Sequence, residues 1–204
     1  MSSTETILLI NSSARSADSY SLPLAKQLAE GLQSKLNGAE IVERDLTENT
    51  PPVVNAAWFA AAYTPQEEIT DETRASLAAS DEIVDEFQKA SALVITVPIY
   101  NFTVSAQLKL WIDQVCRFGR TFTYTENGPK PLGEDRPCYL VVASGGTQIG
   151  SEIDFATGYL KHVLGFIGIT NIHIVEADQL MQHADEKLPA AKKQVEEYIT
   201  SFAA

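Results

Sequence analysis

The chain alternates between short, continuous apolar runs and longer segments with helical periodicity. The apolar runs predict five strands, at Thr6 to Asn11, Ala39 to Asp45, Ala92 to Val97, Cys138 to Ala143 and Asn171 to Val175. The periodic segments predict helices at 22–36, 72–89, 105–117, 155–167 and 185–202. Such alternation favours an α/β fold in which a doubly wound, five-stranded parallel sheet carries helices on both faces. We expect residues 1–204 to form one domain.

Charge and cysteine content narrow the classes of partner. The 27 Asp and Glu residues outnumber the 15 Lys and Arg residues, which disfavours binding to nucleic acid or to anionic membrane surfaces. A small molecule or another protein is the expected partner. Cys116 and Cys138 are too few and too far apart for a disulfide framework or a metal site, so we expect no bound metal and a reducing, cytoplasmic location. Nothing approaches the roughly 20 apolar residues of a bilayer span.

The loop after the first strand has the composition of a phosphate site. Asn11 to Ser21 holds five serines and one arginine directly before a helix. Hydroxyls, backbone N–H groups and the positive end of a helix dipole together suit a terminal phosphate monoester. The glycine fingerprints of dinucleotide and triphosphate sites are absent. An ordinary loop with a serine cap on the next helix would show the same residues.

Two further loops follow strands at the same predicted sheet edge, where ligands of parallel sheets bind. Pro98 to Phe102 can offer backbone groups and a ring plane to a flat ligand. Ala143 to Thr147 contains Gly145 and Gly146, and paired glycines let a backbone approach a ligand closely. Either loop alone is equally consistent with a helix entry or a plain turn, but the three together favour a phosphorylated, planar cofactor.

Two stretches depart from the simple alternation. Leu46 to Ile69 carries three prolines and several aromatic residues and is long for a connection, which favours a functional loop. Thr121 to Leu132 alternates hydroxyl and aromatic residues before Asn127-Gly128, which predicts a short hairpin or an extended excursion after the preceding helix.

Several sequence blocks, in the same order, resemble the FMN-dependent NADH azoreductases and quinone reductases, a family with a flavodoxin-like fold. The blocks are Asn11 to Ser13, Ser19 to Ser21, Pro98 to Phe102, Gln107 to Lys109, Thr121 to Pro129 and Leu164 to Ile169. The resemblance implies that Ser13, Ser19, Tyr20 and Ser21 hold the FMN phosphate, that Pro98, Ile99, Tyr100, Asn101 and Phe102 line the ring, and that Ala143, Ser144, Gly145 and Gly146 meet its pyrimidine end. Members of the family often have arginine where Ser144 stands, and histidine or tyrosine near Thr147 and Gln148.

The resemblance also implies the chemistry. NADH would reduce FMN, and a quinone or azo compound would then collect two electrons in a ping-pong cycle that needs no protein nucleophile. Five aromatic residues are candidates for a wall or lid over a flat acceptor, some of them across a homodimer interface: Trp58, Phe59, Phe118, Phe122 and Tyr124.

Two other functions fit part of the pattern. A flavodoxin-type electron carrier would bind FMN without its own turnover, although the long aromatic loop favours a walled pocket instead. A serine hydrolase would use the serine-rich loop, but the chain has no GxSxG motif. His162, His173 and His183 form no pattern of metal ligands and are expected to be structural or on the surface.

Overall fold

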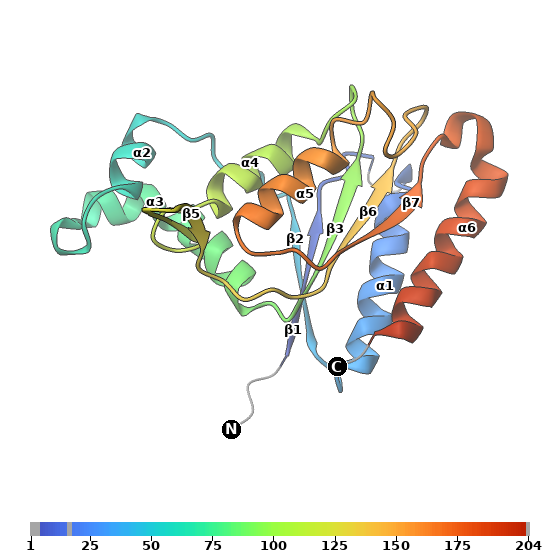
Figure 1. The fold of residues 1–204 in the computed structure, drawn as a ribbon, viewed down its shortest axis with the longest axis horizontal. Helices are drawn as coiled ribbons and strands as arrows, with labels where there is room; N and C mark the ends of the chain where they lie inside the picture. Colours follow the sequence, from blue (N-terminus) through green and yellow to red (C-terminus); the bar gives the residue numbers. More distant parts are fainter. Residues whose placement is uncertain (1–4, 16–17, 203–204) are drawn as a thin grey trace.

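A computed structural model describes residues 5–15 and 18–202. Five parallel strands form the main sheet in the order β2-β1-β3-β6-β7. Their bounds are β1 Thr6–Asn11, β2 Glu40–Asp45, β3 Ala92–Pro98, β6 Cys138–Ala143 and β7 Ile172–Ala177. The predicted five-stranded parallel sheet is confirmed, and Figure 1 shows the arrows of β3, β6 and β7 pointing toward the same edge.

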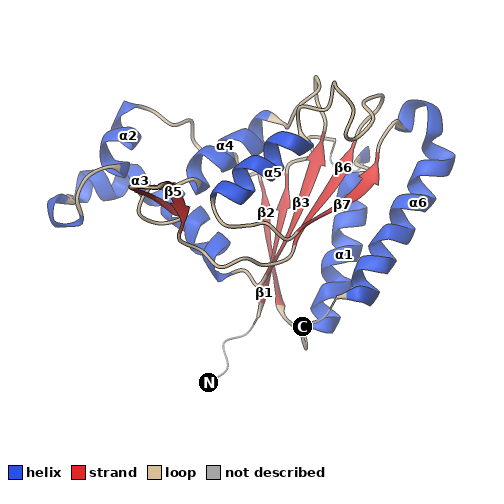
Figure 2. Ribbon diagram, viewed as in Figure 1, coloured by secondary structure: helices blue, strands red, loops and turns tan. Residues whose placement is uncertain are grey.

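Helices cover both faces of the sheet, as Figure 2 shows. Helices α1 (Ser21–Lys35) and α6 (Leu180–Ser201) lie on one face, and α3 (Asp71–Lys89), α4 (Ala106–Val115) and α5 (Thr157–Phe166) lie on the other. The buried strands present apolar side chains to both layers. On β1, Ile7 and Leu9 pack toward α1, while Leu8 and Ile10 pack toward α3 and α4. This double burial explains the continuous apolar runs in the sequence.

The stretch predicted as a long loop contains a helix instead. Helix α2 (Ala56–Ala62) is capped by Asn55, whose side chain accepts the Trp58 N–H, and a 3-10 turn follows at Gln66–Glu68. Trp58, Ala61 and Ala62 pack against Leu77 of α3. The apolar face of this short helix therefore forms a small satellite core beside the main sheet.

The predicted hairpin is confirmed. Strands β4 (Phe122–Thr125) and β5 (Gly128–Pro131) pair antiparallel and form a separate two-stranded sheet. The last helix begins at Leu180, five residues before the predicted start, with non-helical backbone angles at His183. His183 therefore lies within α6 and not in the predicted polar loop. No helix within the described residues combines the length and apolarity that crossing a bilayer requires.

Candidate cofactor site at the carboxyl edge of the sheet

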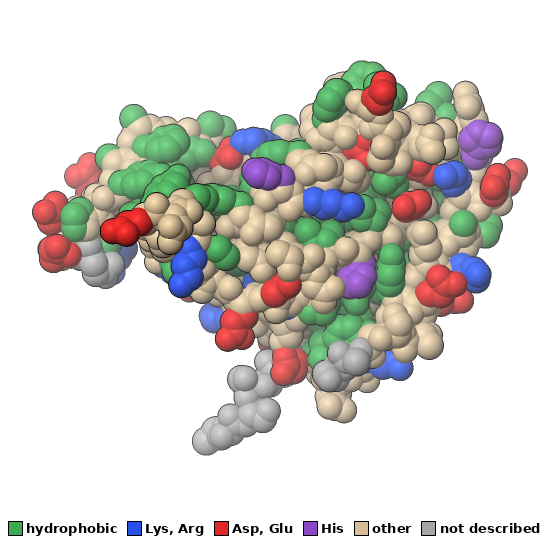
Figure 3. Space-filling view, viewed as in Figure 1, with side chains coloured by type: hydrophobic (Ala, Val, Ile, Leu, Met, Phe, Trp, Pro, Cys, Tyr) green, Lys and Arg blue, Asp and Glu red, His purple; other side chains and the backbone are tan. Residues whose placement is uncertain are grey.

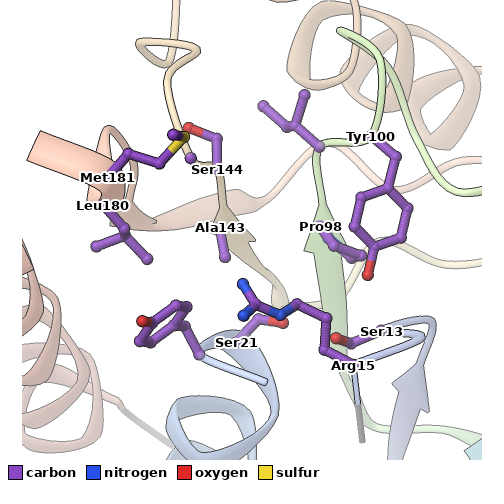
Figure 4. Close-up of a pocket in the computed structure, with 12 residues that line it drawn as sticks. Ser13, Arg15, Ser21, Pro98, Tyr100, Ala143, Ser144, Leu180 and Met181 are labelled. Carbon is purple, nitrogen blue, oxygen red and sulfur yellow. The ribbon is translucent and has the colours of Figure 1, made fainter. Parts of the chain in front are cut away.

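A cavity of about 390 Å³ opens at the carboxyl ends of β1, β3 and β6. Its walls come from the three loops that the sequence singles out and from the start of α6, as Figure 4 shows. The described lining residues are Ser13, Arg15, Tyr20, Ser21, Pro98, Ile99, Tyr100, Ala143, Ser144, Gly145, Leu180 and Met181. Nine of them are residues predicted to bind the cofactor.

A buried polar network positions the loop after β1. The Ser12 N–H donates to Thr96 Oγ1 at 2.8 Å, and the Ser12 hydroxyl donates to the Thr96 carbonyl at 2.6 Å. Asn11 donates through Nδ2 to Asp45 at 2.8 Å and accepts the Ser13 N–H at 3.1 Å. Because these groups are buried, losing one partner leaves a costly unsatisfied group. The network holds Ser13 at the cavity wall.

The amino end of α1 forms the floor of the cavity. Ser21 is the first helical residue, and no acidic side chain occupies the first turn. Ser19 is buried, and its hydroxyl accepts the Leu22 N–H at 3.1 Å. This arrangement aims a positive helix end at the cavity. Ser19 thus supports the helix start without lining the cavity, whereas Tyr20 and Ser21 line it. Ser16 and Ala17 of this loop lie outside the described residues.

A tight turn projects from the end of β3. Tyr100 and Thr103 exchange two backbone hydrogen bonds, at 3.0 and 3.2 Å, across Asn101 and Phe102. Both central residues have positive φ, 47° at Asn101 and 72° at Phe102, as a type I′ turn requires. Asparagine tolerates this region, but phenylalanine pays roughly 1–2 kcal/mol to occupy it. Non-glycine residues held in this region cluster at functional sites.

Contacts at both ends fix this turn against its neighbours. The Tyr100 hydroxyl accepts the Ala14 N–H at 3.2 Å, which ties the turn to the loop after β1. The Phe102 carbonyl accepts the Phe155 N–H at 3.0 Å. Asn101 lines a second, more apolar cavity of about 770 Å³, next to Phe155 and Tyr159, and Phe102 is half exposed. Tyr100 lines both cavities and separates them.

Ser144 organises the loop after β6. Its hydroxyl donates to the Thr147 carbonyl and accepts the Gln179 N–H at 3.2 Å, and its carbonyl accepts the Leu180 N–H at 3.0 Å. These bonds join the loop to the start of α6. They explain why Leu180 reaches a cavity built by segments far away in the sequence.

The two glycines of this loop differ in their surroundings. A Cβ on Gly145 would lie 3.1 Å from Sδ of Met181 on α6, a side chain that is 85% exposed and can shift to make room. A Cβ on Gly146 would meet no atom within 4 Å, and Gly146 does not line the cavity. Of the predicted pair, only Gly145 lines the cavity, and the close approach of both glycines to a ligand stays a prediction.

An ion pair between a buried carboxylate and a partly exposed lysine lies behind the same loop. Asp178 is 1% exposed; one carboxylate oxygen accepts the Ile149 N–H at 2.8 Å and the other lies 2.7 Å from Lys187 Nζ. The hydrogen bond to Asp178 raises the pKa of Lys187. The loop is therefore anchored to α6 on both sides of the glycine pair.

The five aromatic residues predicted to form a wall lie away from this cavity in the folded chain. Trp58 and Phe122 are buried, and Trp58 donates through Nε1 to Gln114 at 2.9 Å. Phe59 and Tyr124 are 55% and 61% exposed, and the Phe118 ring stacks 6.1 Å from Tyr124. None of the five is among the described residues that line the cavity.

Sequence reasoning missed three lining residues: Arg15, Leu180 and Met181. Arg15 stands in the loop that the serines mark, so its sequence position was a usable signal. Leu180 and Met181 follow β7, and only the order of strands in the sheet brings them beside Ser144.

Comparisons with known proteins agree with this geometry. The family described as "Flavodoxin-like fold" matches residues 5–199. The "FMN-dependent NADH:quinone oxidoreductase 1" of Jannaschia sp. (strain CCS1) is 48% identical over 93% of this chain and 96% of its own. The enzyme of the same name from Hahella chejuensis is 44% identical, over 93% of this chain and 92% of its own.

The chain belongs to the FMN-dependent NADH:quinone oxidoreductase family. The resemblance stated from the sequence blocks is therefore confirmed. Among solved structures, an FMN-dependent NADH-azoreductase from Bacillus anthracis str. Ames Ancestor, in complex with FMN, superposes with a TM-score of 0.86. It is 27% identical and covers 98% of this oxidoreductase-family chain and 100% of its own.

The thiols and histidines of this family member lie outside the cavity. Cys116 and Cys138 are free, and burial raises the pKa of each to about 12, so both are protonated at neutral pH. None of the three histidines is among the described lining residues, which leaves the cavity serines without an imidazole base. Within the described residues, no three His, Cys, Asp or Glu side chains gather as a metal site would require.

Proposed function

We propose that this chain is an FMN-dependent enzyme that uses NADH to reduce quinones and azo compounds. The observation that carries the proposal is the convergence of three loops on one cavity at the carboxyl edge of the sheet, in a member of this oxidoreductase family. The arrangement supports a bound planar cofactor whose phosphate faces α1.

The donors in the cavity fit FMN. The hydroxyls of Ser13 and Ser21 and the start of α1 offer neutral donors and a positive dipole, and no carboxylate belongs to the described lining. In this proposal Ser13 and Ser19 to Ser21 hold the phosphate, and Ser19 acts by fixing the helix start. Pro98 to Phe102 line the ring, and Ala143 to Gly146 meet its pyrimidine end.

The chemistry that FMN supplies when bound is the transfer of two electrons from NADH to the acceptor. The protein positions the reactants and shapes the polarity around them. The carbonyls of Ser144 and Gly145 accept N–H groups at the start of α6, and the Ser144 N–H donates to the Ala177 carbonyl. The Gly145 N–H is therefore the backbone donor of this segment that is oriented before ligand arrives and can favour negative charge at that end of the site. Donor and acceptor would use one cavity in turn, so we expect ping-pong kinetics.

Homodimerisation is the second part of the proposal. An apolar and mostly aromatic face, in which the rings of Tyr63 and Phe118 stack with their centres 5.3 Å apart, is formed by Val53, Phe59, Tyr63, Phe118 and Tyr124. Figure 3 shows hydrophobic side chains gathered over α2, and four of the five are more than half exposed. Contiguous exposed apolar surface of this kind marks interaction sites. A second copy seated on this face would supply the aromatic wall that each cavity lacks within its own subunit.

The mass of the protein in solution tests the proposed dimer. Sedimentation equilibrium should give twice the chain mass, and Phe59→Ser with Tyr124→Ser should shift the protein to monomer. A monomeric wild type at micromolar concentration would contradict the dimer and leave the cofactor assignment unaffected.

We also place the enzyme in the cytoplasm, since both cysteines are free.

Purified protein tests the cofactor and the reaction. We expect a yellow preparation whose absorbance near 450 nm bleaches with NADH and returns when a quinone is added. A yellow protein that NADH does not bleach would indicate an electron carrier. A colourless protein that takes up no added FMN would overturn the proposed function.

A further inference from the structure

Arg15 is the one charged side chain among the described residues that line the cavity. The chain as a whole carries a formal charge of −12, yet the described lining of this cavity contains a cation and no carboxylate. Figure 4 shows the guanidinium of Arg15 reaching toward the centre of the cavity, between Ser21 and Ala143.

The guanidinium is held differently from most other arginines of the chain. Arg44, Arg117 and Arg120 each pair with a carboxylate on α3. Arg15 makes no ion pair with any described residue, and its guanidinium carbon instead lies 5.5 Å from the centre of the Tyr20 ring. A contact of this kind is weak at an exposed site, so it leaves the guanidinium free to exchange a ring face for an anion.

The position of Arg15 matches the phosphate end of the proposed cofactor. It follows Ser13 by two residues and faces Ser21 at the positive end of α1. Serine hydroxyls and N–H groups are neutral donors that accommodate an anion, whereas a guanidinium adds a full charge and a planar fork of donors.

We propose that Arg15 is a specificity-determining residue: on binding it moves from the Tyr20 ring to the phosphate of FMN and makes binding depend on the phosphate dianion. The inference rests on the proposed function, because it assumes that FMN occupies the cavity. It assigns discrimination between FMN and its unphosphorylated form, riboflavin, mainly to one side chain.

Binding measurements on apoprotein test this assignment. Flavin fluorescence quenching gives Kd for FMN and for riboflavin with the wild type, Arg15→Gln, Arg15→Lys and a control, Arg74→Gln, which removes an exposed arginine outside the cavity. We expect Arg15→Gln to weaken FMN binding about 10- to 100-fold. Riboflavin binding should change less than about 2-fold, Arg15→Lys should be intermediate, and the control should match the wild type.

The pH dependence provides a second readout. The second pKa of a phosphate monoester is about 6, so wild-type affinity for FMN should fall as the pH drops from 7.5 to 5. The affinity of Arg15→Gln for FMN should fall less over this range, because the variant lacks the guanidinium that interacts with the second charge of the phosphate.

Three results would count against the assignment. Equal weakening of FMN and riboflavin would mean that Arg15 only shapes the loop. An unchanged Kd for FMN in Arg15→Gln would mean that it does not contact the phosphate. A wild type that binds neither flavin would overturn the proposed function itself, an outcome that the wild-type titration alone identifies.

Discussion

Thr96→Val should destabilise the protein and weaken its hold on FMN, although the two side chains have nearly the same shape. Thr96 is fully buried on β3, next to the end of β1. Its hydroxyl accepts the Ser12 N–H at 2.8 Å and donates to Asn11 Oδ1 at 3.2 Å. Valine removes both bonds and leaves the buried Ser12 N–H without this partner.

The size of the effect follows from which groups are left unpaired. Asn11 Oδ1 keeps the Ser13 N–H, so the main loss is one buried backbone donor, worth about 1–3 kcal/mol. For a chain of this size, 2 kcal/mol corresponds to a fall of about 4–8 °C in Tm. Because Ser12 sets the position of Ser13, we also expect FMN affinity to fall about 10-fold, or about 1.4 kcal/mol.

Urea unfolding of the apoprotein and flavin titration provide the two measurements. Thr96→Ser is the matched control: it keeps the hydroxyl and loses only a methyl group, which should cost about 0.5–1.5 kcal/mol and leave FMN affinity nearly unchanged. If Thr96→Val proved as stable as the wild type, or less damaging than Thr96→Ser, the hydrogen-bond network would not be what positions this loop.

Three further predictions concern the same edge of the sheet. Asn101→Ala should weaken FMN retention; unchanged flavin occupancy after dialysis would argue against that contact. Phe102→Asn should stabilise the apoprotein by about 0.5–1 kcal/mol in urea unfolding, by relieving the positive φ, while weakening FMN binding; lower stability would refute the strain. Burial would raise the pKa of Asp45 and Asp154, but hydrogen bonds lower both pKa values below 3.8. Their stabilisation is therefore complete above about pH 4 and lost as the pH falls further; urea midpoints that stay constant from pH 5 to 3 would contradict this.

The strands were predicted most accurately from the sequence, and the short helix α2 was not predicted at all. Thr6–Asn11 and Cys138–Ala143 appear in the structure with the predicted bounds, because strands covered on both faces must be apolar throughout. Helix α2 escaped prediction since its seven residues follow Pro51 and Pro52 and span too few turns to show a period. What keeps it helical is its packing against Leu77 of α3 and its cap at Asn55.

At the site, residue types were readable but their geometry was not. The serines before α1, the turn at Pro98 to Phe102 and the glycines after β6 were marked by composition and by their place after strands. The positive φ values at Asn101 and Phe102 depend on hydrogen bonds across the turn and to Phe155. These hydrogen bonds could not be predicted from the local sequence.

The alternation of apolar runs and amphipathic segments was enough to predict a parallel sheet that binds its ligand at the carboxyl ends of the strands. Burial on one or two faces of an element requires apolar residues at regular positions, and this pattern is visible in the sequence. Only the tertiary structure decided which loops share a wall. The strand order places β7 beside β6, so the start of α6 lies next to Ser144, and Leu180 and Met181 close the cavity. Gln179, directly before them, is 35 residues beyond Ser144 and donates its N–H to the Ser144 hydroxyl. Such contacts are set by which elements become neighbours in the folded chain, and no local sequence pattern in either segment indicates its partner.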